Sequence, residues 1–191
     1  MKANAAERLI LGSGSPRRKE ILSLADIEFE VLVSDVDESY EADMAADDVP
    51  ELLAIRKARA IEQQFGVTQV TILTADTIVA VDDIILGKPV DRDDAIQMLQ
   101  MLSGKKHKVL TGVCCLKSEC MITFKDVTWV TFSEINLSDI EYYVDKYQPY
   151  DKAGSYAIQE WIGVRHISKI EGCYYNVMGL PLPKILTELG W

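Results

Sequence analysis

The sequence predicts an α/β fold, built as one domain over residues 1–191 whose length also allows two lobes around a cleft. Short apolar runs rich in β-branched residues alternate with segments of helical periodicity from residue 9 to the C-terminus. A chain of 191 residues has the size of one ordinary domain, and 48% hydrophobic residues are enough for a core. The chain contains no internal repeat, low-complexity tract or linker that would divide it.

The first element is an apolar strand over residues 9–11, followed by a loop of small residues and a helix of about nine residues. Ser15 is predicted as the N-cap of this helix and Pro16 as its first residue. Backbone N–H groups and the positive end of the helix dipole would face a ligand in the loop. Arg17 and Arg18 add guanidinium groups that suit phosphate oxygens. The alternative is a surface turn with two solvated arginines.

Periodicity and capping residues place the other helices. The first helix is expected to bury four apolar residues: Ile21, Leu22, Leu24 and Ala25. A second helix is predicted over residues 52–65, and the clearest one begins at Asp91. Ser138 and Glu141 form a capping box for a helix that runs to about residue 146. Pro181 starts the last helix.

Strands are predicted over residues 29–33, 70–73, 78–81, 84–86, 108–116, 121–135 and 164–170. The two strands over residues 78–86 form a hairpin whose turn is Asp82 and Asp83. The apolar run over residues 70–73 is expected to end at residues 75–77, so that Asp76 lies between two strands. A carboxylate between two apolar strands is costly to bury unless a cation, a hydrogen-bond network or a metal compensates it. Asp76 is therefore a site candidate, and a turn-forming aspartate is the alternative.

The charge distribution limits the partners. A formal net charge of −10 argues against nucleic acid, although a local basic cluster with a divalent cation can still hold a small phosphorylated substrate. Residues 35–51 contain eight acidic residues and no basic one, and Glu38 is close to the end of the preceding strand, where α/β proteins place ligands. No apolar run approaches the length of about 20 residues that spans a bilayer, and residues 1–8 are not expected to form a signal peptide. We expect a cytoplasmic protein without a membrane partner.

Cysteine and histidine offer few functional signals. The four cysteines show neither a CxxC pair nor a histidine at ligand spacing, so they are predicted to be reduced and mostly packed thiols. His107 and His166 have no partner in a recognisable nucleophile motif. General-base catalysis is therefore expected from carboxylates, with help from a metal.

Eleven fragments in sequence order resemble the Maf family of nucleoside triphosphate pyrophosphatases. They lie at residues 13–18 (SGSPRR), 34–38 (SDVDE), 57–58 (KA), 75–77 (ADT), 87–89 (GKP), 102–104 (LSG), 111–113 (TGV), 151–154 (DKAG), 158–159 (IQ), 170–172 (IEG) and 176–181 (NVMGLP). Each fragment alone is weak, and their order along nearly the whole chain is what makes the resemblance specific.

The resemblance implies a long twisted mixed sheet flanked by helices, with two lobes around a central cleft, related in architecture to the inosine triphosphate pyrophosphatases. It implies hydrolysis between the α- and β-phosphates with Mg²⁺ or Mn²⁺, giving a nucleoside monophosphate and pyrophosphate. The family role would be removal of non-standard or excess nucleotides, with a link to arrest of septum formation. A homodimer is also implied.

The resemblance assigns roles to individual residues. Asp76 matches the proposed general base, and Glu38 and Lys88 complete the catalytic set. Asp76 and Glu38 are the metal-ligand candidates. Seven further residues are implied to bind the substrate: Ser13, Arg17, Arg18, Lys57, Thr77, Lys152 and Gln159. Among these, Arg17, Thr77 and Gln159 match positions tied to substrate choice.

The fragments at residues 75–77 and 153–159 resemble the branch that acts on dTTP and UTP. The sequence departs from the family pattern at residues 55–56, at Thr74 and at residues 160–162, and these departures are expected to affect specificity more than activity. Two alternatives stay open. One is a nucleotide-binding regulator of septum formation with little catalysis, and the other is a purine-directed pyrophosphatase acting on 7-methyl-GTP or ITP.

Overall fold

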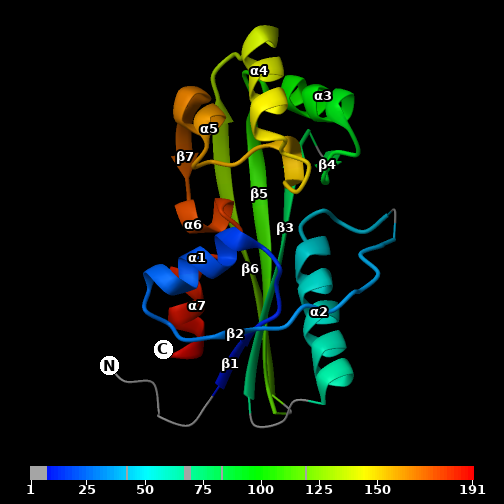
Figure 1. Ribbon diagram of the computed structural model, residues 1–191, viewed down its shortest axis with the longest axis vertical. Helices are drawn as coiled ribbons and strands as arrows, with labels where there is room; N and C mark the ends of the chain where they lie inside the picture. The colour runs from blue at the N-terminus through cyan, green and yellow to red at the C-terminus, as the bar shows by residue number, and fades with distance from the viewer. Residues whose placement is uncertain (1–7, 42, 67–69, 83, 119) are drawn as a thin grey trace. The chain divides into compact units, whose positions relative to one another are not determined.

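The computed structural model describes residues 8–41, 43–66, 70–82, 84–118 and 120–191 (Figure 1). Within these residues, seven strands form one mixed sheet in the order β2-β1-β3-β5-β6-β7, with β4 paired to β3. The strands are β1 (Arg8–Leu11), β2 (Glu30–Val31), β3 (Val70–Val81), β4 (Ile84–Leu86), β5 (Lys106–Lys117), β6 (Cys120–Phe132) and β7 (Ile167–Glu171). The predicted mixed α/β fold is confirmed.

The helices flank this sheet. They are α1 (Pro16–Leu24), α2 (Val49–Phe65), α3 (Arg92–Leu102), α4 (Leu137–Tyr147), the 3-10 turn η1 (Ala153–Ser155), α5 (Trp161–His166), α6 (Tyr174–Val177) and α7 (Leu182–Leu189). Of the helices in the described part of the chain, none combines the length and the apolar composition that a bilayer crossing requires.

The chain divides into two compact units. The first unit comprises Met1–Asp76, Thr111–Asp126 and Gly179–Trp191, and the second comprises Thr77–Leu110 and Val127–Met178. Strands β3, β5 and β6 each contribute residues to both units. The expectation of a single domain with a central cleft stays a prediction.

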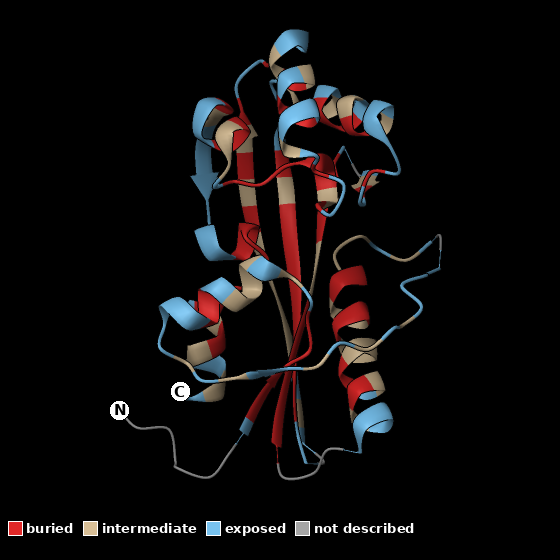
Figure 2. Ribbon diagram, viewed as in Figure 1, coloured by how far each residue is buried: buried red, intermediate tan, exposed pale blue. Residues whose placement is uncertain are grey.

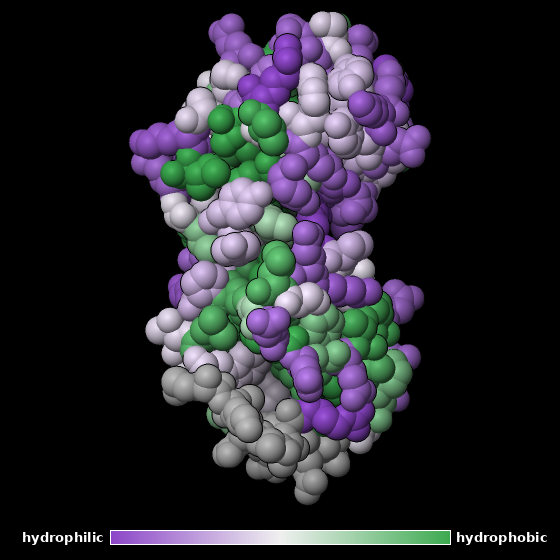
Figure 3. All heavy atoms as spheres, turned by 60° about the vertical axis from the view of Figure 1, so that its left-hand side comes forward, coloured by the Kyte–Doolittle hydropathy of each residue, from purple (hydrophilic) through white to green (hydrophobic). Residues whose placement is uncertain are grey.

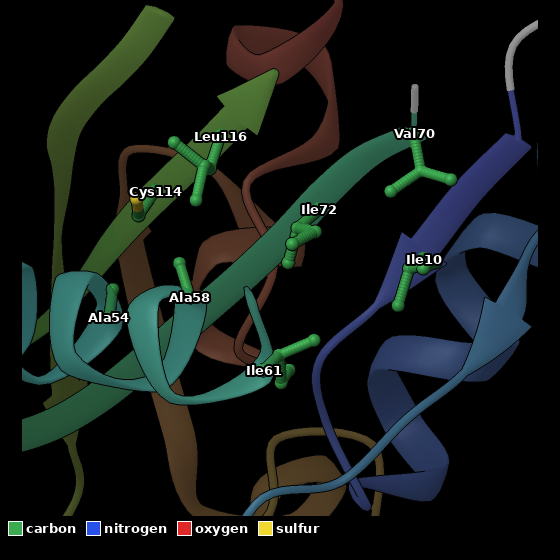
Figure 4. Packing of buried hydrophobic residues seen from close by; sticks show 8 residues of the cluster. All are labelled: Ile10, Ala54, Ala58, Ile61, Val70, Ile72, Cys114 and Leu116. Atoms are coloured by element: carbon green, nitrogen blue, oxygen red, sulfur yellow. The ribbon is translucent and has the colours of Figure 1, made fainter. Parts of the chain in front are cut away.

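The first unit has a parallel core. Strand β1 pairs in parallel with β2 and with β3, and Leu11 lies opposite Leu73 of β3. In Figure 2, β1 is buried beyond its first residue. Helix α2 covers these strands, and side chains of α2, β1, β3 and β5 form one buried cluster (Figure 4). Its members are Ile10, Ala54, Ala58, Ile61, Val70, Ile72, Cys114 and Leu116. The small alanines on α2 let this helix lie close to the sheet.

A glycine of β5 permits the closest approach of α2. A Cβ atom on Gly112 would lie 2.2 Å from the backbone nitrogen of Glu51 and 2.4 Å from the carbonyl oxygen of Pro50. Only a residue without a side chain leaves room for the first turn of α2 at this point. The position of α2 is therefore fixed by backbone contact as well as by apolar packing.

The second unit contains antiparallel pairs. The β3–β4 hairpin has Val81 opposite Ile84, as predicted, although Asp83 of its turn lies outside the described residues. Helix α3 buries four residues at the predicted helical spacing: Ala95, Met98, Leu99 and Leu102. Asp91 caps this helix by accepting a hydrogen bond from the backbone N–H of Asp94. The predicted helix at Asp91 is thus confirmed.

The prediction that a strand ends at residues 75–77 is wrong. Strand β3 continues from Val70 to Val81, so Asp76 lies within it and is not a turn residue. β-branched residues on both sides of Asp76, among them Thr74 and Ile78, favour an extended backbone. The carboxylate is tolerated in the strand because it has a cationic partner.

Two predictions near the C-terminal half are also wrong. Helix α4 is capped by Asn136, whose side chain accepts from the backbone N–H of Asp139, so Ser138 and Glu141 do not form the capping box. The strand predicted over residues 164–170 begins only at Ile167, because Trp161–His166 forms α5. Short helices and short strands have similar apolar content, and sequence periodicity does not separate them at this length.

Other boundaries differ by a few residues. Helix α2 begins at Val49, three residues before the predicted start, and the strand predicted over residues 29–33 is reduced to Glu30–Val31. In α1, Ile21 and Leu22 are buried as expected, but Leu24 and Ala25 are exposed. The apolar face of α1 is therefore narrower than its composition suggests.

Exposed apolar side chains are divided among several places. Figure 3 shows one face on which hydrophobic residues gather in separate patches between hydrophilic ones. Among the described residues drawn on that face, no single apolar surface stands out, and the homodimer implied by the resemblance stays a prediction.

Candidate active site

The first predicted loop leads into α1 as expected. Ser15 is the N-cap and Pro16 the first helical residue, but the Ser15 side chain makes no capping hydrogen bond. Instead, the hydroxyl of the buried Ser13 accepts from the Ser15 backbone N–H at 3.2 Å and from Arg18 Nη1 at 3.1 Å. Arg18 Nε also donates to the carbonyl oxygen of Gly179 at 2.7 Å. Ser13 and Arg18 are thereby joined in one hydrogen-bonded loop.

Lys57 lies between the two carboxylates predicted for catalysis. Its Nζ is 2.5 Å from Asp76 Oδ1 and 2.7 Å from Glu38 Oε1. The Lys57 and Asp76 side chains are only 16% and 13% exposed, whereas the Glu38 side chain is half exposed. Desolvation strengthens the attraction between Lys57 and Asp76 relative to a surface pair. The Lys57 ammonium therefore points to the buried carboxylate of Asp76.

Regular structure brings these groups together. Alternate residues of β3 point to the same face, so Asp76 shares a face with Val70 and Ile72, which pack against α2. Lys57 lies on α2 one turn after Ala54, which belongs to the same packed cluster. The contact between Lys57 and Asp76 is thus an extension of the hydrophobic contact between α2 and β3.

Arg18 belongs to the same electrostatic environment. Burial lowers the pKa of the Arg18 guanidinium, and the nearby Arg17 lowers it further, while the Asp76 and Glu38 carboxylates act in the opposite direction. An arginine stays protonated at any accessible pH, so Arg18 keeps its positive charge here. The first unit therefore gathers cationic and anionic groups around the residues predicted to act on a triphosphate.

The segment that carries Glu38 is held by Arg56. Arg56 Nη1 donates to the carbonyl oxygens of Asp37 and Ser39, the residues on either side of Glu38. The Asp37 carboxylate in turn accepts from the backbone N–H and the hydroxyl of Ser39, at 2.8 and 2.7 Å. Arg56 thus has contacts that shape the Glu38 segment.

The second unit contains the remaining predicted residues. Lys152 is buried, and its Nζ lies 2.7 Å from Asp151 Oδ1 and 3.5 Å from Glu160 Oε1. The backbone N–H of Gly154 donates to the carbonyl oxygen of Gly87 at 3.0 Å. This bond brings the loop that carries Lys152 to the segment that carries Lys88.

A left-handed backbone makes this approach possible. Gly154 has φ +67°, and a Cβ atom there would lie 3.0 Å from the side chain of Val79.

Lys88 and Gln159 have exposed side chains, and Thr77 and Arg17 are partly exposed. The catalytic role of Lys88 and the substrate-binding roles of the other three residues stay predictions.

Two residues of the second unit were not recognised from the sequence. The Tyr143 hydroxyl donates to Glu160 Oε2 and accepts from the backbone N–H of Ala157 at 3.3 Å. Tyr143 is completely buried, so its hydroxyl needs these partners. Glu160 was noted only as a departure from the family pattern, and the helical pattern of residues 140–144 gave no sign that Tyr143 would support it.

The arrangement of Glu38 and Asp76 fits a divalent metal ion. Both carboxylates lie within bonding distance of one cation, the Lys57 ammonium, so their oxygens converge on a small region. Mg²⁺ commonly binds through one or two carboxylates together with substrate phosphates. Within the described ranges, no group of three or more His, Cys, Asp and Glu residues could hold a metal ion. The cysteines are free thiols as predicted, although Cys120 is exposed rather than packed.

Comparison with known proteins identifies the family of the chain. A family model described as Maf-like protein matches residues 8–190. A protein of Bacteroides thetaiotaomicron named dTTP/UTP pyrophosphatase is 46% identical over 183 residues, covering 95% of this chain and 94% of that protein. A protein of Porphyromonas gingivalis with the same name is 48% identical over 184 residues, covering 95% and 92%.

Among solved structures, the Ham1 protein of Staphylococcus aureus is 13% identical, with a TM-score of 0.47 and coverage of 66% of this chain and 72% of that one. This likeness is too distant to support an argument. The family model, by contrast, matches nearly the whole chain, and the protein therefore belongs to the Maf-like protein family.

Proposed function

We propose that this protein hydrolyses dTTP, UTP and related pyrimidine nucleoside triphosphates to the nucleoside monophosphate and pyrophosphate. The observation that carries the proposal is the placement of Lys57 between Glu38 and Asp76, beside Arg18. Phosphoryl transfer needs neutralised phosphate oxygens and a positioned water more than it needs a covalent intermediate. The names of the relatives that are 46 to 48% identical support the same substrates.

The cationic groups of the first unit would hold the phosphates. The guanidinium of Arg18 is fixed by Ser13 and by the carbonyl oxygen of Gly179, which limits its motion before substrate binds. Arg17 extends from the same helical turn and would add a second guanidinium. Preorganised donors of this kind stabilise charge that develops in the transition state without further reorganisation.

Asp76 would act as the general base. Lys57 donates to Asp76 Oδ1, which fixes the orientation of the carboxylate. The carboxylate would accept a proton from a water molecule, and that water would attack the linkage between the α- and β-phosphates. The P–O bond that joins the nucleoside monophosphate to pyrophosphate would break, and the oxygen of the water would stay on the phosphorus that it attacked.

Glu38 and Asp76 would also hold the divalent ion that the family resemblance implies. Such an ion neutralises phosphate charge and makes a bound water more acidic. Glu38 is the more exposed of the two carboxylates and would exchange its contact with Lys57 for a ligand position.

The family resemblance implies further substrate contacts. Lys88 and Lys152 would bind phosphate oxygens, and the exposed amide of Gln159 can both donate to and accept from a pyrimidine edge. Thr77, next to Asp76 on β3, would contribute its hydroxyl. These assignments rest on the family resemblance.

The test is product analysis of the purified protein with Mg²⁺ or Mn²⁺ against dTTP, UTP, CTP, GTP, ITP and 7-methyl-GTP. We expect equal amounts of monophosphate and pyrophosphate, with dTTP and UTP turned over fastest. Faster turnover of ITP or 7-methyl-GTP would replace the pyrimidine assignment with a purine one. Binding of nucleotide without any product would contradict the enzymatic function.

A further inference from the structure

Thr74 is a buried polar residue at the contact between β3 and α2. It lies two residues before Asp76 and has no exposed surface. Its hydroxyl donates to the carbonyl oxygen of Ala54 in α2 at 2.6 Å and lies 3.4 Å from the carbonyl oxygen of Cys114 in β5. A hydroxyl in a hydrophobic cluster is costly unless it is hydrogen-bonded, and this one bridges a strand to a helix.

The bridge lies directly beside the Lys57/Asp76 pair. Thr74 and Asp76 share the face of β3 that is turned to α2, because they are two residues apart. Ala54 and Lys57 are three residues apart on α2, which is nearly one turn. The contact between Thr74 and Ala54 is therefore next to the contact between Asp76 and Lys57 along both β3 and α2.

The methyl group of Thr74 meets the first loop. A Cβ atom placed on Gly12 would lie 2.5 Å from Thr74 Cγ2, so the loop backbone packs directly against this methyl. The Gly12 N–H donates to the carbonyl oxygen of Leu73 at 2.8 Å, which holds the loop to β3 at the same level. Thr74 thus contacts both the helix that carries Lys57 and the loop that leads to Ser13.

We propose that Thr74 is a positioning residue for catalysis, which sets the place of Lys57 relative to Asp76 through its hydrogen bond to Ala54. This inference rests on the proposed function, because it assigns Asp76 as the base. Thr74 does not touch substrate in this account. It acts by fixing α2 on β3 at the point from which Lys57 projects.

Replacement by valine tests the hydrogen bond while keeping the shape. A methyl carbon is not tolerated at 2.6 Å from a carbonyl oxygen, since such contacts are ordinarily about 3.3 Å or longer. In Thr74→Val, α2 must therefore move away from β3 at Ala54, and Lys57 moves with it. Thr74→Ser keeps the hydroxyl and loses only the methyl.

The experiment compares kcat, KM and the melting temperature of the unmodified protein, Thr74→Val and Thr74→Ser with dTTP as substrate. We expect Thr74→Val to lower kcat about tenfold, with a smaller change in KM, because the geometry of proton transfer is more demanding than binding. Thr74→Ser should retain kcat within about twofold, since the hydrogen bond is kept.

Ile72→Val is the matched control. Ile72 lies on the same face of the same strand, and removing its methyl group lowers stability without touching the Thr74 contact. At a temperature well below every melting point, Ile72→Val should leave kcat unchanged. If Ile72→Val and Thr74→Val lose the same activity for the same loss of stability, the role of Thr74 is structural only and the inference is overturned.

Further outcomes separate the two proposals. Unchanged kcat in Thr74→Val, with normal turnover by the unmodified protein, would overturn the inference and leave the proposed function intact. No turnover by the unmodified protein would overturn both. Should Thr74→Val fail to fold, Thr74→Ala removes the hydroxyl without introducing a clash, and its kcat is expected to fall while that of Thr74→Ser does not.

Discussion

Lys57 in the first unit and Lys152 in the second are each held between two carboxylates, and they differ in what supports them. Lys57 belongs to a long helix, and its buried partner Asp76 belongs to a long strand. Lys152 belongs to a loop, and its nearer partner is its neighbour in the chain, Asp151, whose side chain is 63% exposed. The more buried carboxylate near Lys152 is Glu160, at 3.5 Å.

This difference suits two different tasks. A general base must be held close to the geometry of proton transfer, and a helix packed on a strand provides such a frame. A lysine that binds phosphate needs only to present positive charge, which a loop can do while adapting to the ligand. The comparison predicts that changes around Lys57 affect kcat and that changes around Lys152 affect KM.

The largest effect on kcat is expected from replacing Asp76, the partner of Lys57, and a small one from replacing Asp151, the partner of Lys152. Asp76→Asn should lower kcat by about a thousandfold or more, because the variant lacks a group that can accept the proton. Asp151→Asn is the matched control and should change kcat by less than about threefold, since the Asp151 side chain is 63% exposed and a solvated carboxylate contributes little to an ion pair. Steady-state kinetics with dTTP, with circular dichroism to verify folding, measures both. Normal turnover by a folded Asp76→Asn would remove Asp76 as the base.

The second prediction compares the lysines directly. Lys57→Met should lower kcat/KM by about a hundredfold, because it removes a preorganised cation and leaves Asp76 without its partner. Lys152→Met should lower kcat/KM by about tenfold, mainly through a higher KM, because Glu160 keeps its hydrogen bond from Tyr143. Equal effects of the two substitutions on kcat would contradict the division of tasks.

Acid should lower the free energy of unfolding because unfolding lets the buried His107 take up a proton. Burial lowers the pKa of His107 to about 4 from the ordinary value of 6.5, and His107 Nε2 lies 2.8 Å from the Tyr156 hydroxyl. Because the unfolded chain binds the proton first, stability is complete above pH 6.5 and is lost as the pH falls toward 4. The expected loss in the free energy of unfolding is about 2 kcal/mol at pH 5.

Denaturant unfolding of the unmodified protein and of His107→Gln between pH 7 and pH 4 measures this contribution. Gln can keep a polar contact with Tyr156 but does not titrate. We expect the unmodified protein to lose about 2 kcal/mol more than His107→Gln between pH 7 and pH 5. Parallel curves for the two proteins would show that His107 is not responsible.

The smallest effect concerns the support of Lys152. Tyr143→Phe removes the hydroxyl that bonds Glu160 and the Ala157 N–H, and should lower the free energy of unfolding by about 1 kcal/mol. It should also raise KM for dTTP by a few-fold without a matching fall in kcat. Tyr142→Phe, on the exposed side of α4, is the control and should leave both unchanged. A fall in kcat with constant KM would place Tyr143 with the Lys57 group instead.

Local signals predicted much of this molecule. The loop before Pro16, the helix capped by Asp91 and the hairpin beside Asp82 were predicted because their signals lie within a few residues of each other. Two of the errors arose where two local signals competed. Asn136 precedes Ser138 and caps α4 in its place, and residues 161–166 form a helix next to a strand of equal apolar content.

By itself, the sequence determined the α/β class, the order of most elements and the family, because apolar periodicity, caps and an ordered set of fragments are properties of the chain. Only the tertiary structure decided which charged groups meet. Lys57 and Asp76 are 19 residues apart, and their contact depends on how far α2 approaches β3. That distance is set by Gly112, the small alanines of α2 and the hydroxyl of Thr74, whose packing and hydrogen bonding exist only in the folded chain.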